Sequence, residues 1–198
     1  MKKILFVLFS ALFLTGMTPL FAQFEITPYG GWMLGGGRYE YSVESGPNYG
    51  IQLGANAGDD TKFIFFYNRM DSRLTKETAL GEENLTNLAT EYLQLGVLRE
   101  VYHNDVLAPF GIFTMGTTIF TPKNSIYYTE WFFSITLGGG LRVYLTDHLG
   151  LQFQARMLMP MRFGGGGFWC GTGGCSVGAG AYSAIVQGDF SGGIVFKF

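Results

Sequence analysis

Polar and apolar side chains alternate with a period of two along most of this sequence. The range 130–145 is the clearest case, with large apolar residues such as Trp131 and Ile135 at its odd positions. Its even positions include Ser134 and Arg142. Because successive side chains of a β-strand point to opposite sides, this pattern predicts a strand with one apolar and one polar face.

Further stretches with this alternation predict an all-β fold built from eight strands, at 24–34, 48–57, 62–70, 91–102, 106–118, 130–145, 149–162 and 184–198. The facing of 106–118 is ambiguous, and Ile64 and Phe66 blur the pattern of 62–70. Short turns follow the second, fourth and sixth strands, whereas long loops are expected at 35–47, 71–90, 119–129 and 163–183. This alternation of connections is typical of an antiparallel up-and-down transmembrane β-barrel, in which the short turns and both termini share one end.

The two faces of these strands must be assigned to the inside and the outside of the barrel. Period two alone also fits a soluble barrel with an apolar interior. However, only 14% of the residues are charged and 17% are aromatic, which favours lipid on the outside. The polar faces carry Glu100, Arg142, Arg156 and Asp189. We therefore predict a lumen charge network that plugs the barrel, because eight strands leave room only for side chains.

Aromatic residues near the strand ends support a membrane-spanning arrangement. Trp32 and Trp131 lie near the expected external ends, and Phe24 and Phe63 lie near the expected periplasmic ends. Transmembrane barrels carry aromatic girdles at both lipid interfaces. A ten-residue strand tilted by about 40° crosses roughly 25 Å, which matches the height of the apolar band.

The N-terminus has the three regions of a secretory signal peptide. Lys2 and Lys3 precede an apolar run at 4–14, and a stretch ending at the small residue Ala22 follows it. We predict cleavage after Ala22, which leaves residues 23–198 as the barrel domain. A retained anchor is the alternative, but the apolar run is shorter than the ~20 residues of a spanning helix.

The two cysteines, Cys170 and Cys175, lie close together in a glycine-rich stretch. In an oxidising compartment such a pair predicts a disulfide, worth roughly 2 kcal/mol for so short a loop. A metal site would need more ligands, and no His, Asp or Glu lies between Phe163 and Ala181. We therefore expect no metal and no cofactor.

Two classes of function are disfavoured by the composition and by the glycine runs. The formal net charge is -2 and the chain has no basic run beyond Lys2 and Lys3, so we expect no nucleic-acid partner. The glycine runs at 35–37, 138–140 and 164–167 precede no helix and carry no following GKS or GKT, which excludes a nucleotide loop. We interpret 138–140 as a place of tight barrel curvature and the other runs as bends or flexible loop stems.

The end of the chain has a pattern of its own. Its last eight residues place a polar residue at Ser191, glycine at Gly193 and aromatic residues at Phe196 and Phe198. This pattern resembles the C-terminal assembly signal of bacterial outer-membrane β-barrels, which the barrel-assembly machinery reads. The whole of 23–198 resembles the small outer-membrane barrel superfamily that includes the outer-membrane protein A and X barrels, in a form without a periplasmic domain.

This resemblance implies a chain in the bacterial outer membrane, surrounded by the lipid bilayer and lipopolysaccharide. We expect a non-enzymatic barrel whose four external loops serve surface interaction, adhesion or envelope integrity, through a ligand that the sequence does not name. A small passive channel is the alternative. A lipid-modifying enzyme is less favoured, because His103 and His148 both lie in short turns at the periplasmic end, far from outer-leaflet lipid.

Overall fold

The computed structural model describes residues 24–38, 41–58, 60–78, 81–101, 106–124, 128–171, 174–183 and 186–198. For 37–38, 41, 77–78, 81–83, 162–171 and 174–183 it describes only the backbone. The predicted signal peptide, 1–22, lies outside these residues. Within them, no helix is long and apolar enough to cross a membrane.

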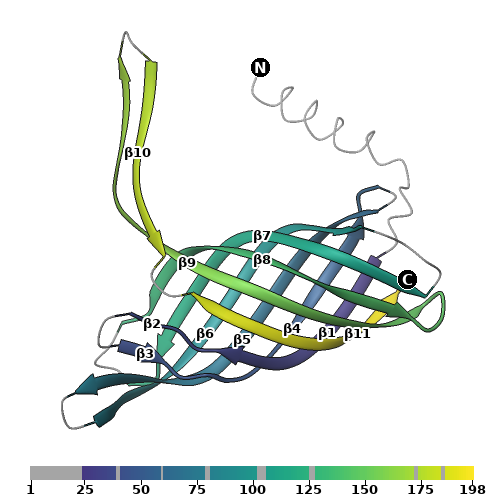
Figure 1. The fold of residues 1–198 in the computed structure, drawn as a ribbon, viewed down its shortest axis with the longest axis horizontal. Helices are drawn as coiled ribbons and strands as arrows, with labels where there is room; N and C mark the ends of the chain where they lie inside the picture. The colour runs from purple at the N-terminus through teal and green to yellow at the C-terminus, as the bar shows by residue number, and fades with distance from the viewer. Residues whose placement is uncertain are drawn as a thin grey trace, which may run out of the picture.

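The described chain folds into one closed antiparallel sheet (Figure 1). Its eight principal strands are β1 (Phe24–Leu34), β4 (Gly46–Asn56), β5 (Thr61–Thr78), β6 (Gly81–Glu100), β7 (Leu107–Pro122), β8 (Glu130–Tyr144), β9 (Leu149–Gly171) and β11 (Gln187–Lys197). Three further strands extend this barrel at one end, namely β2 (Gly37–Arg38), β3 (Tyr41–Val43) and β10 (Gly174–Ser183). The predicted eight-stranded up-and-down barrel is thereby confirmed.

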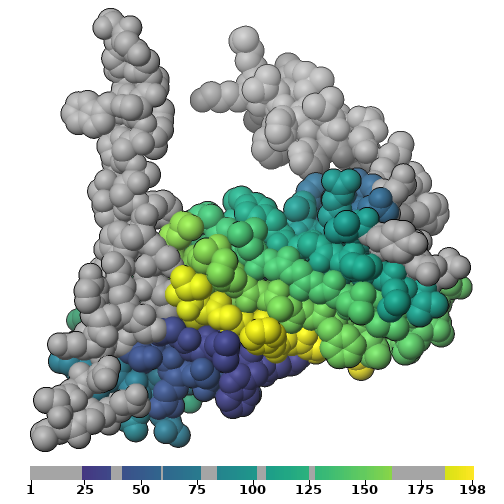
Figure 2. Space-filling model, viewed as in Figure 1, coloured from purple at the N-terminus to yellow at the C-terminus, as the bar shows by residue number. Residues whose placement is uncertain are grey.

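The final strand closes the barrel as predicted. β11 pairs with β9 on one side and with β1 on the other, so the yellow end of the chain lies between green and purple strands in Figure 2. Along β1 the pairing runs from Glu25 opposite Lys197 to Leu34 opposite Gly188. The backbone amide of Phe198 donates to the carbonyl of Phe24 at 2.9 Å. Closure of this kind removes the unpaired edges that hydrocarbon cannot solvate.

The predicted long loops are wrong in part, because several of the strands continue through them. β5 and β6 stay paired from Met70 opposite Thr90 out to Thr78 opposite Gly81, across most of the expected loop 71–90. β9 and β10 form a second long hairpin through the expected loop 163–183. The prediction ended each strand where its apolar face ended. A hairpin in water needs no apolar face on its outer side, so backbone pairing can continue beyond the membrane.

The glycine run 164–167 is part of this second hairpin and is not a loop stem. Gly166 and Gly167 lie opposite Ala179 and Gly178 in the register of β9 and β10. Their strand conformation corrects the prediction of a flexible segment, whereas the register shift between Ala179 and Ala181, opposite Gly164 and Gly165, agrees with the predicted bend. In contrast, 138–140 lies inside β8 as expected. A side chain at Gly138 would come within 2.8 Å of the Arg156 side chain, so glycine there makes room for the interior.

The structure assigns the inside and the outside of every principal strand. In β7, whose facing the sequence left open, Ile112 and Thr114 are buried, whereas Phe113 and Met115 are exposed. Large apolar side chains cover the outside of the barrel, and buried polar side chains line much of its interior. This arrangement is the reverse of a soluble protein and matches a lipid-facing surface.

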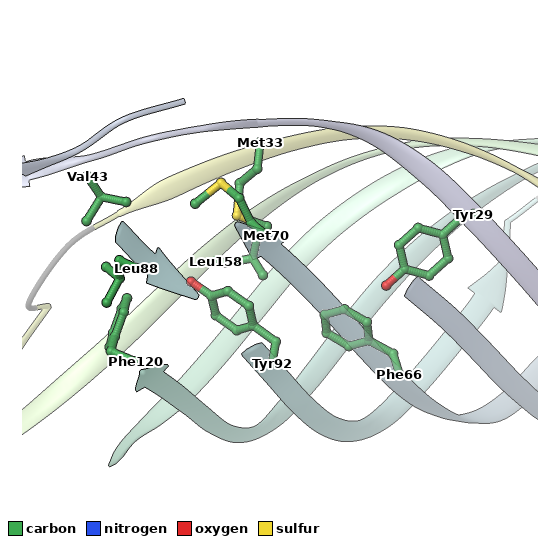
Figure 3. Packing of buried hydrophobic residues seen from close by; sticks show 9 residues of the cluster. All are labelled: Tyr29, Met33, Val43, Phe66, Met70, Leu88, Tyr92, Phe120 and Leu158. Carbon is green, nitrogen blue, oxygen red and sulfur yellow. The ribbon is translucent and has the colours of Figure 1, made fainter. Parts of the chain in front are cut away.

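An apolar cluster occupies the part of the interior nearer the long hairpins (Figure 3). Tyr92 and Phe66 point into it from β6 and β5, and Phe120 and Leu158 approach from β7 and β9. Ile64 and Phe66, which blurred the sequence pattern, both point inward and are buried. The interior is therefore less uniformly polar than the sequence pattern predicted.

Candidate functional site

Two groups of buried charges lie inside the barrel, and the first is near its short turns. This turn-end cluster consists of Glu25 of β1, Lys62 of β5, Glu100 of β6 and Arg142 of β8. Nη1 of Arg142 lies 2.8 Å from Oε2 of Glu25 and 3.2 Å from Oε1 of Glu100. Nζ of Lys62 forms ion pairs with the same two carboxylates. These two cations and two anions are all almost fully buried.

Two neutral groups and a third cation complete the bonding of the turn-end cluster. Nε of Arg142 donates to Oε1 of Gln152 at 2.8 Å, and the hydroxyl of Tyr144 donates to Oε1 of Glu100 at 2.7 Å. Nζ of Lys197 lies 4.0 Å from Oε1 of Glu25 and 3.5 Å from the centre of the Tyr144 ring. Such a set of partners offsets the cost of removing the charges from water. The cluster therefore connects β1, β5, β6, β8 and β9 across the interior at this level.

The second group, the central cluster, consists of Asp189, Arg156, Ser191, Asn48 and Tyr29. Nε and Nη2 of Arg156 each lie 2.6 Å from Oδ2 of Asp189. Ser191 donates to the same oxygen at 3.1 Å, and Asn48 donates to Oδ1. The guanidinium carbon of Arg156 lies 4.6 Å from the centre of the Tyr29 ring. The carboxylate of Asp189 is therefore held by side chains from three strands, namely Asn48 of β4, Arg156 of β9 and Ser191 of β11.

The four charged residues predicted from the sequence all point inward, but they form two clusters instead of one network. Glu100 pairs with Arg142 in the turn-end cluster, and Asp189 pairs with Arg156 in the central cluster. Sequence reasoning missed Glu25 and Lys62 as members. Glu25 and Thr27 occupy alternate positions of 24–34, and this polar face is the signal that could have identified Glu25. Lys62 shares its face with Ile64 and Phe66, and this mixed face concealed it.

The residues of the predicted assembly signal also have structural roles in the finished barrel. Ser191 belongs to the central cluster, and Phe198 is exposed on the outer surface. A Cβ at Gly193 would lie 2.6 Å from the carbonyl oxygen of Pro28 and 2.8 Å from Cβ of Tyr29. Only glycine therefore fits at position 193, where β11 pairs with β1. Recognition of Ser191, Gly193, Phe196 and Phe198 by the assembly machinery stays a prediction.

The predicted interface aromatics Trp32, Trp131, Phe24 and Phe63 are all exposed on the outer surface. Charges on that surface mark the limits of the apolar band. On β6, Arg99 and Glu91 flank it, and the outward positions between them are Leu93, Leu95 and Val97. At about 3.3 Å per residue and a tilt near 40°, this separation spans roughly 20 Å, close to the height of a lipid-facing band.

The remaining predicted sites lie partly outside the described residues. The register places Cys170 opposite Cys175 in the hairpin of β9 and β10, but their side chains are not described, so the disulfide stays a prediction. His103 lies outside the described residues, and His148 is exposed in a short turn. Among the side chains that are described, no group of three or more His, Cys, Asp or Glu could hold a metal ion.

Solved structures with the same fold include several small outer-membrane barrels. Neisserial surface protein A matches with a TM-score of 0.60 and 12% identity, over 88% of this chain and 97% of the other. The N-terminal barrel domain of OprF from Pseudomonas aeruginosa gives 0.56 and 13%, over 89% and 98%. Ail, the attachment invasion locus protein of Yersinia pestis, gives 0.52 and 10%, over 89% and 99%. No family model matches the chain, and no curated protein matches it.

Proposed function

We propose that this outer-membrane β-barrel is a non-enzymatic display scaffold, which holds four extracellular connections for surface interaction, adhesion or envelope integrity. The observation that carries the proposal is the combination of a closed interior with strands that continue far beyond the membrane. The scaffold is assembled by the barrel-assembly machinery, and its connections bind an extracellular ligand.

The lengths of the strands support display. About 9 to 11 residues of a tilted strand are enough to cross a bilayer. β5 has 18 residues, β6 has 20 and β9 has 23. Each of these strands therefore has about as many residues outside the membrane as inside it. Figure 1 shows the β9 and β10 hairpin rising away from the barrel at the end opposite the C-terminus. Backbone pairing continues out to Gly171 opposite Gly174, and such a paired hairpin suits recognition better than an unpaired loop does.

The closed interior favours display over the alternative, a small passive channel. Ion pairs connect β1, β5, β6 and β8 across the turn-end cluster, and Arg156 and Asp189 lie above it. The apolar cluster around Tyr92 and Phe66 then fills the part of the interior nearer the extracellular end of the barrel. An ion would have to pass all three layers. We therefore expect a properly inserted barrel to give no discrete conductance in a planar bilayer.

One structural neighbour raises the question whether the ligand is a polyanion. Ail was solved in complex with sucrose octasulfate, a heparin analogue. On this chain, however, the described charges near the hairpin bases are of both signs. Arg69 pairs with Asp71 and Glu91, and Arg73 lies 4.0 Å from Glu44. A surface of paired charges gives little attraction for a polyanion, so we propose a protein or glycan ligand without high negative charge.

Shortening one hairpin tests the proposal. Arg162 and Tyr182 are opposite each other in the register, so an Asn-Gly turn can replace 163–181 without disturbing the barrel. Cells that carry this variant should lose adhesion to coated surfaces or become sensitive to bile salts, while the barrel keeps its heat-modifiable mobility on gels. Unchanged adhesion and resistance after shortening both this hairpin and that of β5 and β6 would contradict display.

The enzyme alternative has its own measurement. Overexpression of the chain should leave the mass spectrum of lipid A unchanged. A new acyl or phosphate modification, lost on substitution of a single polar residue near the outer end, would contradict the proposal that the barrel is not an enzyme.

A further inference from the structure

The lipid-facing surface has an apolar groove near the periplasmic end, the end with the short turns. The groove has a volume of about 730 Å³ and crosses β1, β4, β5, β6 and β7. One row of cross-strand partners runs through it, from Phe24 to Ala55, Phe63, Val97 and Phe113. Large rings thus alternate with small side chains along a line perpendicular to the strands.

This alternation divides the groove into two parallel slots. Neighbouring strands lie about 4.8 Å apart, so rings on alternate strands are about 9.6 Å apart. Subtracting the thickness of an aromatic ring, about 3.5 Å, leaves roughly 6 Å over each small residue. A single acyl chain fits such a width. One slot lies over Ala55 between Phe24 and Phe63, and the other lies over Val97 between Phe63 and Phe113.

A cation lies at the periplasmic end of the second slot. Arg99 follows Val97 on the outward face of β6 and is exposed. Its cross-strand neighbours are Thr61 and Gly111, and a side chain added at Gly111 would meet nothing within 4 Å. None of the described carboxylates forms an ion pair with Arg99. An exposed guanidinium with no ion-pair partner among the described residues thus lies about 7 Å along the strand from the slot.

We propose that this groove binds one anionic diacyl phospholipid of the periplasmic leaflet. Its two acyl chains lie in the two slots, and its phosphate accepts hydrogen bonds from the guanidinium of Arg99. In such a lipid the phosphate is one glycerol unit away from both acyl chains. The distance from the two slots to the guanidinium of Arg99 matches this arrangement. The inference depends on the membrane location and not on the proposed role of the external hairpins.

Native mass spectrometry tests the site directly. The protein is released from nanodiscs of phosphatidylcholine that contain one tenth phosphatidylglycerol, and retained lipid is counted. Wild type should retain one phosphatidylglycerol. Ala55→Phe and Val97→Phe close the slots and should reduce retained lipid at least tenfold. Arg99→Gln should remove the preference for phosphatidylglycerol over phosphatidylcholine while some lipid is still retained.

Matched controls separate this site from general effects on the surface. Leu151→Phe adds a ring to the outward face of β9, and Arg73→Gln removes an exposed arginine from the external part of β5. Both should retain lipid as wild type does, and all variants must show heat-modifiable mobility. If Ala55→Phe does not fold, the smaller change Ala55→Leu replaces it.

Three results would overturn the proposal. Wild type could retain phosphatidylcholine as readily as phosphatidylglycerol, and this result alone would show that Arg99 does not select an anionic headgroup. The slot variants could retain as much lipid as the Leu151→Phe control. Finally, nanodiscs that contain both phosphatidylglycerol and lipid A could yield protein bound to lipid A, which would place the site in the wrong leaflet.

Discussion

Asp189→Ala is the sharpest perturbation of the interior. The substitution removes the carboxylate that lies 2.6 Å from both Nε and Nη2 of Arg156, and the side chains of both residues are at most 1% exposed. Removing one partner of such a buried pair typically costs 3 to 5 kcal/mol, because the remaining charge has no counterion. The rings of Tyr29 and Phe66 still contact Arg156, so we expect the lower end, about 3 kcal/mol.

Urea unfolding of the barrel in lipid vesicles, followed by tryptophan fluorescence and by gel mobility, measures this loss. A value of 3 kcal/mol corresponds to a rise of about a hundredfold in the unfolded-to-folded ratio. The matched control is Asp71→Ala, which breaks an exposed pair with Arg69. Exposed pairs contribute about 0 to 1 kcal/mol, so this control should unfold almost as wild type does.

A double-mutant cycle isolates the pair itself. Arg156→Met combined with Asp189→Ala removes both charges, so the double variant should be clearly more stable than the sum of the single losses implies. We expect a coupling of about 2 kcal/mol. A strong buried pair is contradicted if Asp189→Ala costs no more stability than Asp71→Ala, or if the two single losses simply add in the double variant.

Three further predictions concern the seam and the outer hairpin. Gly193→Val should reduce the yield of folded barrel severely, because its side chain would overlap the backbone next to Tyr29; normal heat-modifiable mobility would contradict this. Deletion of Phe198 should slow insertion into the outer membrane while leaving denaturant stability nearly unchanged, and pulse-chase protease protection distinguishes the two effects. Cys170 and Cys175 should resist alkylation until a reductant is added, and replacing both by serine should increase proteolysis of the hairpin without destabilising the barrel; immediate alkylation of native protein would refute the disulfide.

Much of the barrel could be predicted because strand faces are a local property. A period of two is visible in any ten residues, and the polar positions Arg142, Arg156 and Asp189 all point inward as the alternation requires. The facing of β7 could not be predicted in this way, because the inward residues Phe110 and Ile112 are as apolar as the outward residues beside them. Where both faces are apolar, only the closed barrel shows which one is inside.

The extent of the strands and the partners of the buried charges required the tertiary structure. Strand pairing in the outer hairpins depends on backbone hydrogen bonds, which leave no periodic trace in a polar sequence such as 71–78. The stagger of the closed barrel brings Glu25 next to Lys62 and Arg142, three residues separated widely along the chain. The sequence by itself determined which side chains face lipid in most of the strands, although not in β7, and it determined where the barrel closes. Register and closure, which are properties of the whole sheet, decided which charges neutralise each other and where the outer groove lies.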